Sequence, residues 1–260
     1  MPFRGNRCYK EAHKLKVTSV RSLALAVYLA GGVSVPATAA AVAPTHFKQL
    51  LPSELQQGLT LAERKLLQCV EQGKEADFSS ADASENDPQQ WSRWGPERMI
   101  RGRLLCWLCT DRTVARYVSP KGICVRGAKI AGSIECEGAE VLYPLALRHF
   151  ALPEGIILTR ARAKTMDFSG SYVRGLWANW TVLEGDLVLS GATYLGELQL
   201  RSATIRGDLN CSGARFENPS GYILLAPGAS ITGNVDLRWL RGWGCESLMG
   251  ANIQGNLLCM

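Results

Sequence analysis

The sequence predicts a mainly β protein in which a parallel β-solenoid (β-helix) follows a small α-helical domain. Glycine recurs every eleven residues at Gly185, Gly196 and Gly207, and apolar residues alternate with polar ones between them. Such alternation is typical of short strands with one face inward and one outward. The unit G-x-L-x-L/C-x-x-A-x-I-x returns in residues 229–237 and 251–259. Because a single unit cannot bury its own apolar face, successive coils must stack and share a core.

Two units make one coil of about 22 residues, so residues 22 apart lie over one another at about 4.8 Å. Each buried leucine of such a ladder contributes about 1.5–3 kcal/mol. The 26-residue interval from Gly207 to Gly233 predicts an excursion, for which "ENPSG" (217–221) supplies turn residues. A leucine-rich repeat is the alternative, with longer units and asparagine ladders that the sequence does not display. The predicted inward ladders are Leu187, Leu209, Val235 and Leu257; Ile205, Ile231 and Ile253; and Ala203, Ala229 and Ala251 at a corner.

Residues 50–118 are predicted to form the helical domain, which closes the N-terminal end of the solenoid. Thr60 and Glu63 match a capping box, and Gly73 is a natural end for that helix. Its apolar stripe is predicted to be Leu61, Leu66, Leu67 and Val70. The polar segment 75–90 that follows is predicted to be a surface loop.

A second helix is predicted to begin at Pro96, a favourable first-turn residue. Its apolar face would hold Ile100, Leu104, Trp107 and Leu108. The other face of this helix, or the chain that leads into it, would hold Arg93, Arg98, Arg101 and Arg103. These arginines would form either a solvated surface or a contact for anionic lipid. The repeats occupy residues 119–260.

Residues 1–39 are predicted to be a signal peptide or membrane-anchor leader. Basic residues precede the uncharged apolar run 23–35, and small residues offer a cleavage site after Ala39. We therefore expect a periplasmic or membrane-associated protein. The alternative is a cytoplasmic protein whose start codon lies further downstream.

The net charge of +6 is concentrated in the leader. Residues 1–39 hold six of the 29 basic and one of the 23 acidic side chains, so the remainder is nearly neutral. The chain outside the leader therefore lacks the excess of basic residues that nucleic-acid binding requires, and no nucleic-acid partner is expected. Cys136, Cys211 and Cys259 occupy a repeat position that leucine fills elsewhere, where cysteine acts as a small hydrophobe. That use of cysteine favours a reducing compartment, in conflict with the leader.

Two groups of side chains are candidates for chemistry. Asp186 and Asp208 each follow a repeat glycine and are predicted to stack, with Asn234 and Asn256 continuing the column. They could hold a cation or act as an acid/base pair, but a solvated polar face is favoured because asparagine replaces aspartate. Cys106 and Cys109 in "CWLC" could be a redox pair or half a metal site. Packing is favoured there, because no second CxxC is present. We assign no catalytic, cofactor or metal residue.

Other candidates are weaker. The sequence spacing identifies no Ser or Cys nucleophile as a partner for His149. An exposed aromatic platform is one interpretation of the tryptophans in the repeats, and filling of irregular coils is the other. These tryptophans are Trp177, Trp180, Trp239 and Trp243.

The A-x-I/L-x-G runs resemble the pentapeptide-repeat class of right-handed β-helices, with a longer and less strict unit. As a whole, "WGPERMIRGRLLCWL" running into "VSPKGICVRGAKIAGSIECEGAEV" resembles an uncharacterised bacterial family. Members of that family are sometimes labelled membrane-associated oxidoreductase. The resemblance covers about residues 55–260 and implies a right-handed winding. It transfers no catalytic residue, and the chain lacks the G-x-G-x-x-G fingerprint of dinucleotide-binding oxidoreductases.

The function expected from these patterns is that of a non-enzymatic repeat scaffold for protein–protein or surface contacts. A polysaccharide-active β-helix enzyme is the alternative, and an oxidoreductase is supported by the family label only. The repeat runs to "GNLLCM" without a polar cap, so we expect self-association or a protein partner at the C-terminal coil, or a truncated chain.

Overall fold

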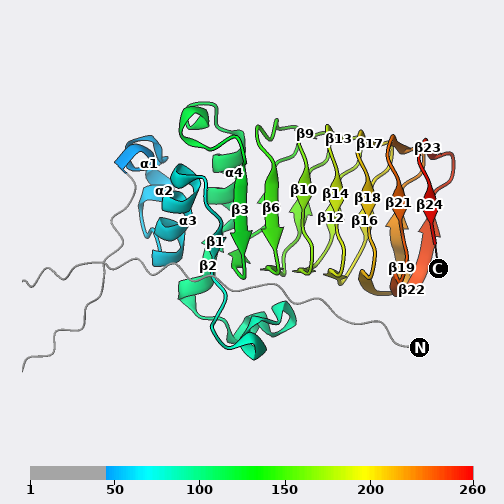
Figure 1. Cartoon of the computed structure of the whole chain (residues 1–260), viewed down its shortest axis with the longest axis horizontal. Helices are drawn as coiled ribbons and strands as arrows, with labels where there is room; N and C mark the ends of the chain where they lie inside the picture. The colour runs from blue at the N-terminus through cyan, green and yellow to red at the C-terminus, as the bar shows by residue number, and fades with distance from the viewer. Residues whose placement is uncertain (1–44, 260) are drawn as a thin grey trace, which may run out of the picture. The chain divides into compact units, whose positions relative to one another are not determined.

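The computed structural model describes residues 45–259, in which a small helical region leads into stacked coils of short strands (Figure 1). The predicted leader, residues 1–39, lies outside the described residues. Among the described residues, no helix has both the length and the apolar character needed to cross a membrane. The α-helices are α1 (Thr45–Leu50), α2 (Ser53–Gln56), α3 (Leu61–Gln72) and α4 (Gly102–Thr110). Short 3-10 turns are η1 (Ala83–Asn86), η2 (Pro88–Arg93), η3 (Pro96–Arg98) and η4 (Ala115–Tyr117).

The strands form three parallel sheets, which confirms the predicted parallel β-solenoid, with about 6 turns. Sheet A runs β1 (Ala76–Asp77), β3 (Ile123–Arg126), β6 (Leu145–Arg148), β10 (Met166–Asp167), β14 (Leu187–Val188), β18 (Leu209–Asn210), β21 (Val235–Asp236) and β24 (Leu257–Leu258). Sheet B runs β2 (Met99–Arg101), β4 (Lys129–Ala131), β7 (Ala151–Leu152), β11 (Tyr172–Val173), β15 (Thr193–Tyr194), β19 (Arg215–Leu225), β16 (Leu198–Gln199), β12 (Leu176–Trp177), β8 (Ile156–Ile157) and β5 (Ile134–Glu135), with β22 (Arg241–Ser247) on β19. Sheet C runs β23 (Asn252–Ile253), β20 (Ser230–Ile231), β17 (Thr204–Ile205), β13 (Val182–Leu183) and β9 (Arg162–Ala163).

Each coil is built from short strands, and its length matches the prediction. One coil contains β14, β15, β16 and β17 in succession. Leu187 pairs with Leu209, which is 22 residues later, and Met166 pairs with Leu187, which is 21 residues later. Two eleven-residue units therefore do close one coil.

The inward ladders are confirmed. Leu187, Leu209 and Val235 are 0% exposed, while Leu257 in the last coil is 49% exposed. Ile205 and Ile231 are likewise fully buried. Their core is continuous with that of the helical region, so burial of apolar surface stabilises both parts together.

Left-handed residues form two columns at the corners of the coils. At these positions the chain turns between strands, and glycine meets the steric demand best. Gly191, with φ of 64°, is one example. The first column is Gly127, His149, Gly170, Gly191, Gly213 and Trp239, and the second is Gly138, Arg160, Trp180, Ser202, Gly228 and Gly250.

The second helix begins at Gly102, so the prediction of a start at Pro96 is wrong. Pro96–Arg98 form a 3-10 turn, and Met99–Arg101 become β2, which pairs with β4. A Cβ on Gly102 would lie 2.1 Å from the carbonyl oxygen of Ser133. Sheet pairing and this close backbone approach override the helical spacing. Ile100 is buried as predicted, but as a residue of a strand and not of a helix.

Two loop predictions also need correction. The polar segment 75–90 begins with β1, which pairs with β3 and buries Ala76. The predicted four-residue excursion lies between Phe216 and Leu224, because Tyr194 pairs with Phe216 at an interval of 22 and Leu198 pairs with Leu224 at an interval of 26. However, 217–221 belongs to β19, whose pairing with β22 shifts register between Glu217 and Tyr222, and is not a free turn. In both places pairing with the solenoid favours extended backbone over the local turn preference. On the apolar stripe of α3, Leu61 is 65% exposed, contrary to the prediction.

Candidate functional site

The column of Asp186, Asp208, Asn234 and Asn256, here called the Asp/Asn column, binds backbone amides. The backbone N–H of Asp208 donates to Asp186 Oδ1 at 2.8 Å. In the same way the N–H of Asn234 donates to Asp208 Oδ1 at 2.6 Å, and that of Asn256 to Asn234 Oδ1 at 3.0 Å. Each side-chain oxygen therefore satisfies an amide of the next coil, which would otherwise need water.

The glycines before Asp208 and Asn234 leave room for the bond. A Cβ on Gly207 would lie 2.0 Å from Asp186 Oδ1, and one on Gly233 would lie 2.2 Å from Asp208 Oδ1. The Gly-Asp and Gly-Asn pairs are thus one structural device. The column that the sequence predicts to stack is therefore a side-chain ladder, and its favoured interpretation as a merely solvated face is corrected, because the oxygens bind backbone amides. Within the described residues, no group of three or more His, Cys, Asp and Glu side chains is arranged to hold a metal ion.

The two cysteines of "CWLC" have different surroundings. Cys109 faces the core and is 2% exposed, and burial raises the pKa of its thiol. Cys106 is partly exposed, and its Sγ donates to the Glu135 carbonyl oxygen at 2.9 Å. The Cys106 sulfur also accepts a hydrogen bond from the thiol of Cys136, 30 residues away.

Cys106 and Cys136, here called the thiol pair, lie with their Sγ atoms 2.9 Å apart. α4 carries Cys106, whereas Cys136 follows β5 and is 3% exposed. The hydrogen bond from Cys136 lowers the pKa of Cys106, in opposition to burial. The same bond and burial raise the pKa of Cys136. Sequence analysis missed Cys136 as a partner, although the repeat did place it inward.

Cys106 lines a cleft of about 790 Å³ between α4, the chain before α3, and the 131–135 segment. Arg103 and Thr110 from α4 also line it, with Ser133 and Glu135 opposite. This volume suits a small ligand. We call this cavity the thiol cleft.

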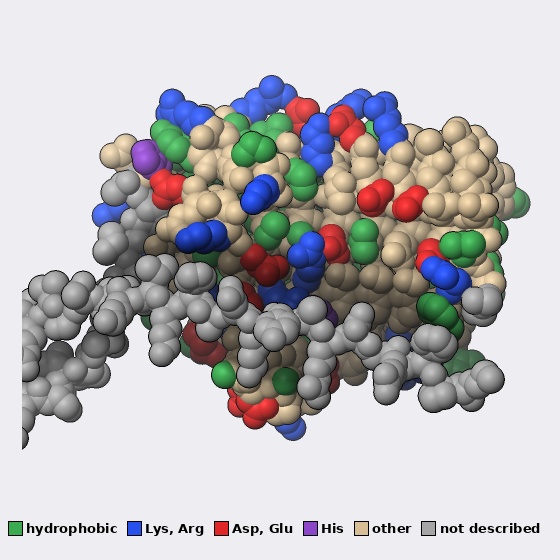
Figure 2. Space-filling model, in the orientation of Figure 1, with side chains coloured by type: hydrophobic (Ala, Val, Ile, Leu, Met, Phe, Trp, Pro, Cys, Tyr) green, Lys and Arg blue, Asp and Glu red, His purple; other side chains and the backbone are tan. Residues whose placement is uncertain are grey.

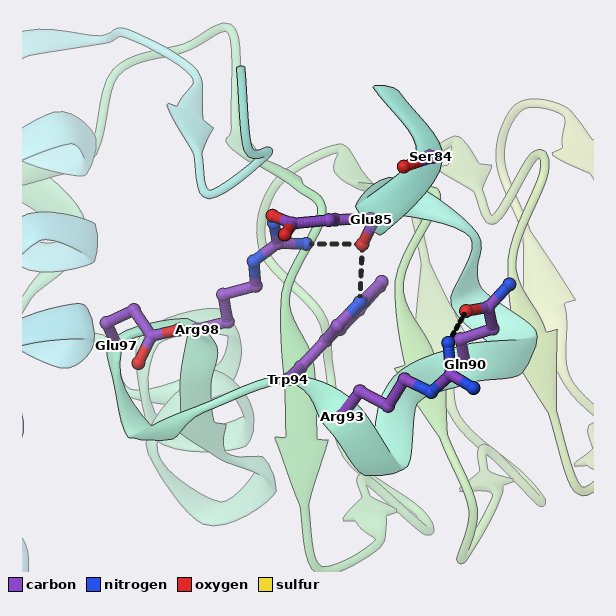
Figure 3. Close-up of a pocket in the computed structure, with 7 residues that line it drawn as sticks. All are labelled: Ser84, Glu85, Gln90, Arg93, Trp94, Glu97 and Arg98. Atoms are coloured by element: carbon purple, nitrogen blue, oxygen red, sulfur yellow. Dashed lines mark hydrogen bonds between the residues drawn. The ribbon is translucent and has the colours of Figure 1, made fainter. Parts of the chain in front are cut away.

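A second cavity, of about 580 Å³, lies among the 3-10 turns of the helical region (Figure 3). Its wall is built around the carbonyl oxygen of Glu85, which accepts hydrogen bonds from Trp94 Nε1 at 2.8 Å and Arg98 Nη1 at 3.3 Å. The Arg98 guanidinium also lies 4.9 Å from the Trp94 ring centroid. These contacts hold the turns together, and Glu85 and Glu97 balance Arg93 and Arg98 in charge.

The predicted outer face of four arginines is not formed. Arg98 is only 6% exposed. Arg101 Nε and Nη2 donate to Glu63 Oε1 and Oε2 at 2.7 and 2.9 Å, so its charge is neutralised inside the helical region. On the face seen in Figure 2, basic and acidic side chains are interspersed along the upper edge. Glu184, which follows β13, pairs with Arg162 and Lys164.

The tryptophans do not share one platform. Trp180 and Trp239, which are 48% and 59% exposed, stand in different corner columns. Trp177 is partly buried, and its ring lies against Gly155. His149 also occupies a corner, where burial and the charge of Arg126 lower its pKa.

Comparison with known proteins identifies no relative: no family model, curated protein or solved structure matches this chain. The candidate sites are therefore argued from their own geometry.

Proposed function

We propose that the chain is a non-enzymatic repeat scaffold, exported or membrane-associated, whose outward surface binds a protein partner. The Asp/Asn column carries this proposal. Their stacking makes Asp186 and Asp208 the carboxylates most suitable for catalysis. Their Oδ1 atoms, however, accept hydrogen bonds from backbone N–H groups of the next coil. A role in joining coils is served equally by Asn234, which cannot act as a general acid or base.

We place the partner surface at the corner formed by Arg160 and Trp180. The guanidinium carbon of Arg160 lies 5.5 Å from the Trp180 ring centroid, and both residues stand outward in the left-handed corner column. Tryptophan and arginine are the side chains most enriched where protein interfaces gain their energy. The backbone N–H groups of both residues donate to carbonyl oxygens of the next coil, so no loop has to be ordered on binding.

The more specific relationships are also proposals. Short parallel strands with stacked inward residues support a relation to the pentapeptide-repeat β-helices. Export rests on the leader, residues 1–39, and fractionation of the native cells with N-terminal sequencing tests it. No observation favours the oxidoreductase label of the similar bacterial family, and self-association stays a prediction.

The partner surface is tested with proteins cross-linked to the full chain in its native cells. Each captured protein is purified and titrated against the wild type, Trp180→Ala and Asp186→Asn. We expect saturable binding that weakens at least tenfold in Trp180→Ala and is unchanged in Asp186→Asn. Folding of each variant is checked by circular dichroism.

Two results would overturn the proposal. One is that no captured protein binds the purified wild type saturably. The other is hydrolysis of a polysaccharide by the wild type that both Asp186→Asn and Asp208→Asn abolish. Asparagine retains the oxygen that accepts the backbone amide, so these substitutions remove acid/base chemistry while preserving the ladder.

A further inference from the structure

The thiol pair bridges two parts of the chain that are far apart in sequence. Cys106 is on α4 of the helical region, and Cys136 follows β5 in the first coil of the solenoid. Their sulfurs are 2.9 Å apart, and a disulfide bond is about 2.05 Å long. Closure therefore requires the two sulfurs to approach by less than about 1 Å.

The two thiols differ in access, as an attacking and a resolving cysteine should. Cys106 is partly exposed at the wall of the thiol cleft, whereas Cys136 is 97% buried behind it. Arg103 lines the same cleft together with Glu54, Glu135 and Glu154, so the lining does not select an acidic ligand, and access to the Cys106 sulfur is what the cleft provides. The hydrogen bond from Cys136 also favours the thiolate at Cys106, which is the reactive form.

We propose that Cys106 is a site of reversible oxidation by a small disulfide such as oxidised glutathione. Cys136 then resolves the modified cysteine into an intramolecular disulfide. The product fastens α4 to the first coil by a covalent bond. This inference is independent of the proposed scaffold function and of its partner surface.

The reaction balances as two thiol–disulfide exchanges. The Cys106 thiolate attacks one sulfur of oxidised glutathione, the glutathione S–S bond breaks, and one glutathione leaves as a thiolate that takes up the proton lost by Cys106. Cys136, after losing its proton, attacks Cys106 Sγ and expels the second glutathione, which takes up that proton. Two protein thiols are oxidised while one glutathione disulfide is reduced to two thiols.

The other cysteines provide internal controls. Cys109 lies on the same helix, three residues from Cys106, and its buried thiol is the partner that sequence spacing nominates. Cys124 is partly buried in β3, where burial raises the pKa of its thiol. Cys245 and Cys259 are exposed, so they are replaced by serine to avoid cross-linking between molecules.

The test is mass mapping of the full chain carrying Cys245→Ser and Cys259→Ser, incubated with oxidised and reduced glutathione, alkylated and digested with trypsin. Cys106 and Cys109 fall in peptide 104–112, Cys136 in 130–148 and Cys124 in 122–126. We expect 104–112 to be linked to 130–148, at a rate at least tenfold above modification of Cys124. The link should persist in Cys109→Ser, disappear in Cys106→Ser, and be reversed by reduced glutathione.

Three outcomes would overturn the proposal, and the first two use the folded parent protein without further substitution. One is a disulfide inside peptide 104–112, which would join Cys106 to Cys109. Another is a stable glutathione adduct on Cys106 that never resolves to the cross-link. The third is a link between the two peptides that is lost in Cys109→Ser and retained in Cys106→Ser.

Discussion

Removal of the Glu63 carboxylate is expected to destabilise the protein more than any surface substitution. Glu63 is 0% exposed and receives two hydrogen bonds from the Arg101 side chain and one from the Arg101 backbone N–H, at 2.7, 2.9 and 3.0 Å. The N–H of Thr60 adds a fourth at 3.1 Å as part of the capping box. One carboxylate thus accepts hydrogen bonds from backbone N–H groups both at the start of α3 and at the end of β2.

The magnitude follows from what Glu63→Ala leaves behind. Breaking a buried ion pair by removing one partner costs about 3–5 kcal/mol, because the remaining charge is uncompensated. The Arg101 side chain is 27% exposed and regains some water, which places the expected loss near the lower limit, about 3 kcal/mol. The lost capping interaction is worth about 1 kcal/mol and is partly included in that value.

The assay is urea unfolding followed by both tryptophan fluorescence and circular dichroism, with coincidence of the two curves as the check on cooperativity. Glu184→Ala is the control, because its ion pairs with Arg162 and Lys164 are exposed to solvent and should contribute little to the free energy of unfolding. In the double variant with Arg101→Met, the loss should be smaller than the sum of the single losses. The reasoning fails if Glu63→Ala and Glu184→Ala lower the free energy of unfolding equally.

Three further predictions use the same unfolding assay. Tyr194→Phe should raise the free energy of unfolding by about 1 kcal/mol, because the Tyr194 hydroxyl is buried without a hydrogen-bond partner among the described residues; a loss of stability would contradict this. Gly191→Ala should lower it by about 1–2 kcal/mol, because φ is 64° while no atom lies within 4 Å of the added Cβ, so the cost is purely conformational; an unchanged stability would refute it. Burial acts to raise the pKa of Asp167, but hydrogen bonds from Arg148 and Ser169 and the charge of Arg148 outweigh it and hold the pKa below its ordinary value of 3.8. The carboxylate's contribution is therefore complete above that value and lost as pH falls through the depressed pKa, so the stability difference between wild type and Asp167→Asn should shrink below pH 3.8 and stay constant between pH 5 and 7.

The solenoid was predictable because the same pattern of buried and exposed positions recurs in every repeat. Leu187, Leu209 and Val235 must be apolar wherever two coils stack, so their spacing encodes both burial and register. The helical region lacks such redundancy. Each of its contacts with the first coil occurs once and leaves no period in the sequence. β2 shows the consequence: Ile100 fits a helical stripe, yet pairing with β4 makes Met99–Arg101 a strand.

The contacts missed at the candidate sites are all long-range. The capping box of Thr60 and Glu63 was predicted because its members are three residues apart, and it forms as expected. The bond from Glu63 to Arg101 spans 38 residues and depends on how α3 docks against β2. The thiol pair spans 30 residues and depends on how α4 docks against β5. In both cases the sequence shows the residue types, but it does not show how the elements that carry them pack against each other.

The Asp/Asn column shows where composition alone could have decided between two functions. A catalytic carboxylate must keep its ability to exchange a proton, so asparagine in an equivalent position would abolish its role. A backbone acceptor needs only an oxygen on a short side chain, which aspartate and asparagine both provide. The exchange of Asp208 for Asn234 in the next coil, with the hydrogen bond to the following amide preserved, therefore favours the ladder over catalysis. The glycines before Asp208 and Asn234 reinforce the argument, because the approach of the side-chain oxygen requires them and acid/base chemistry does not.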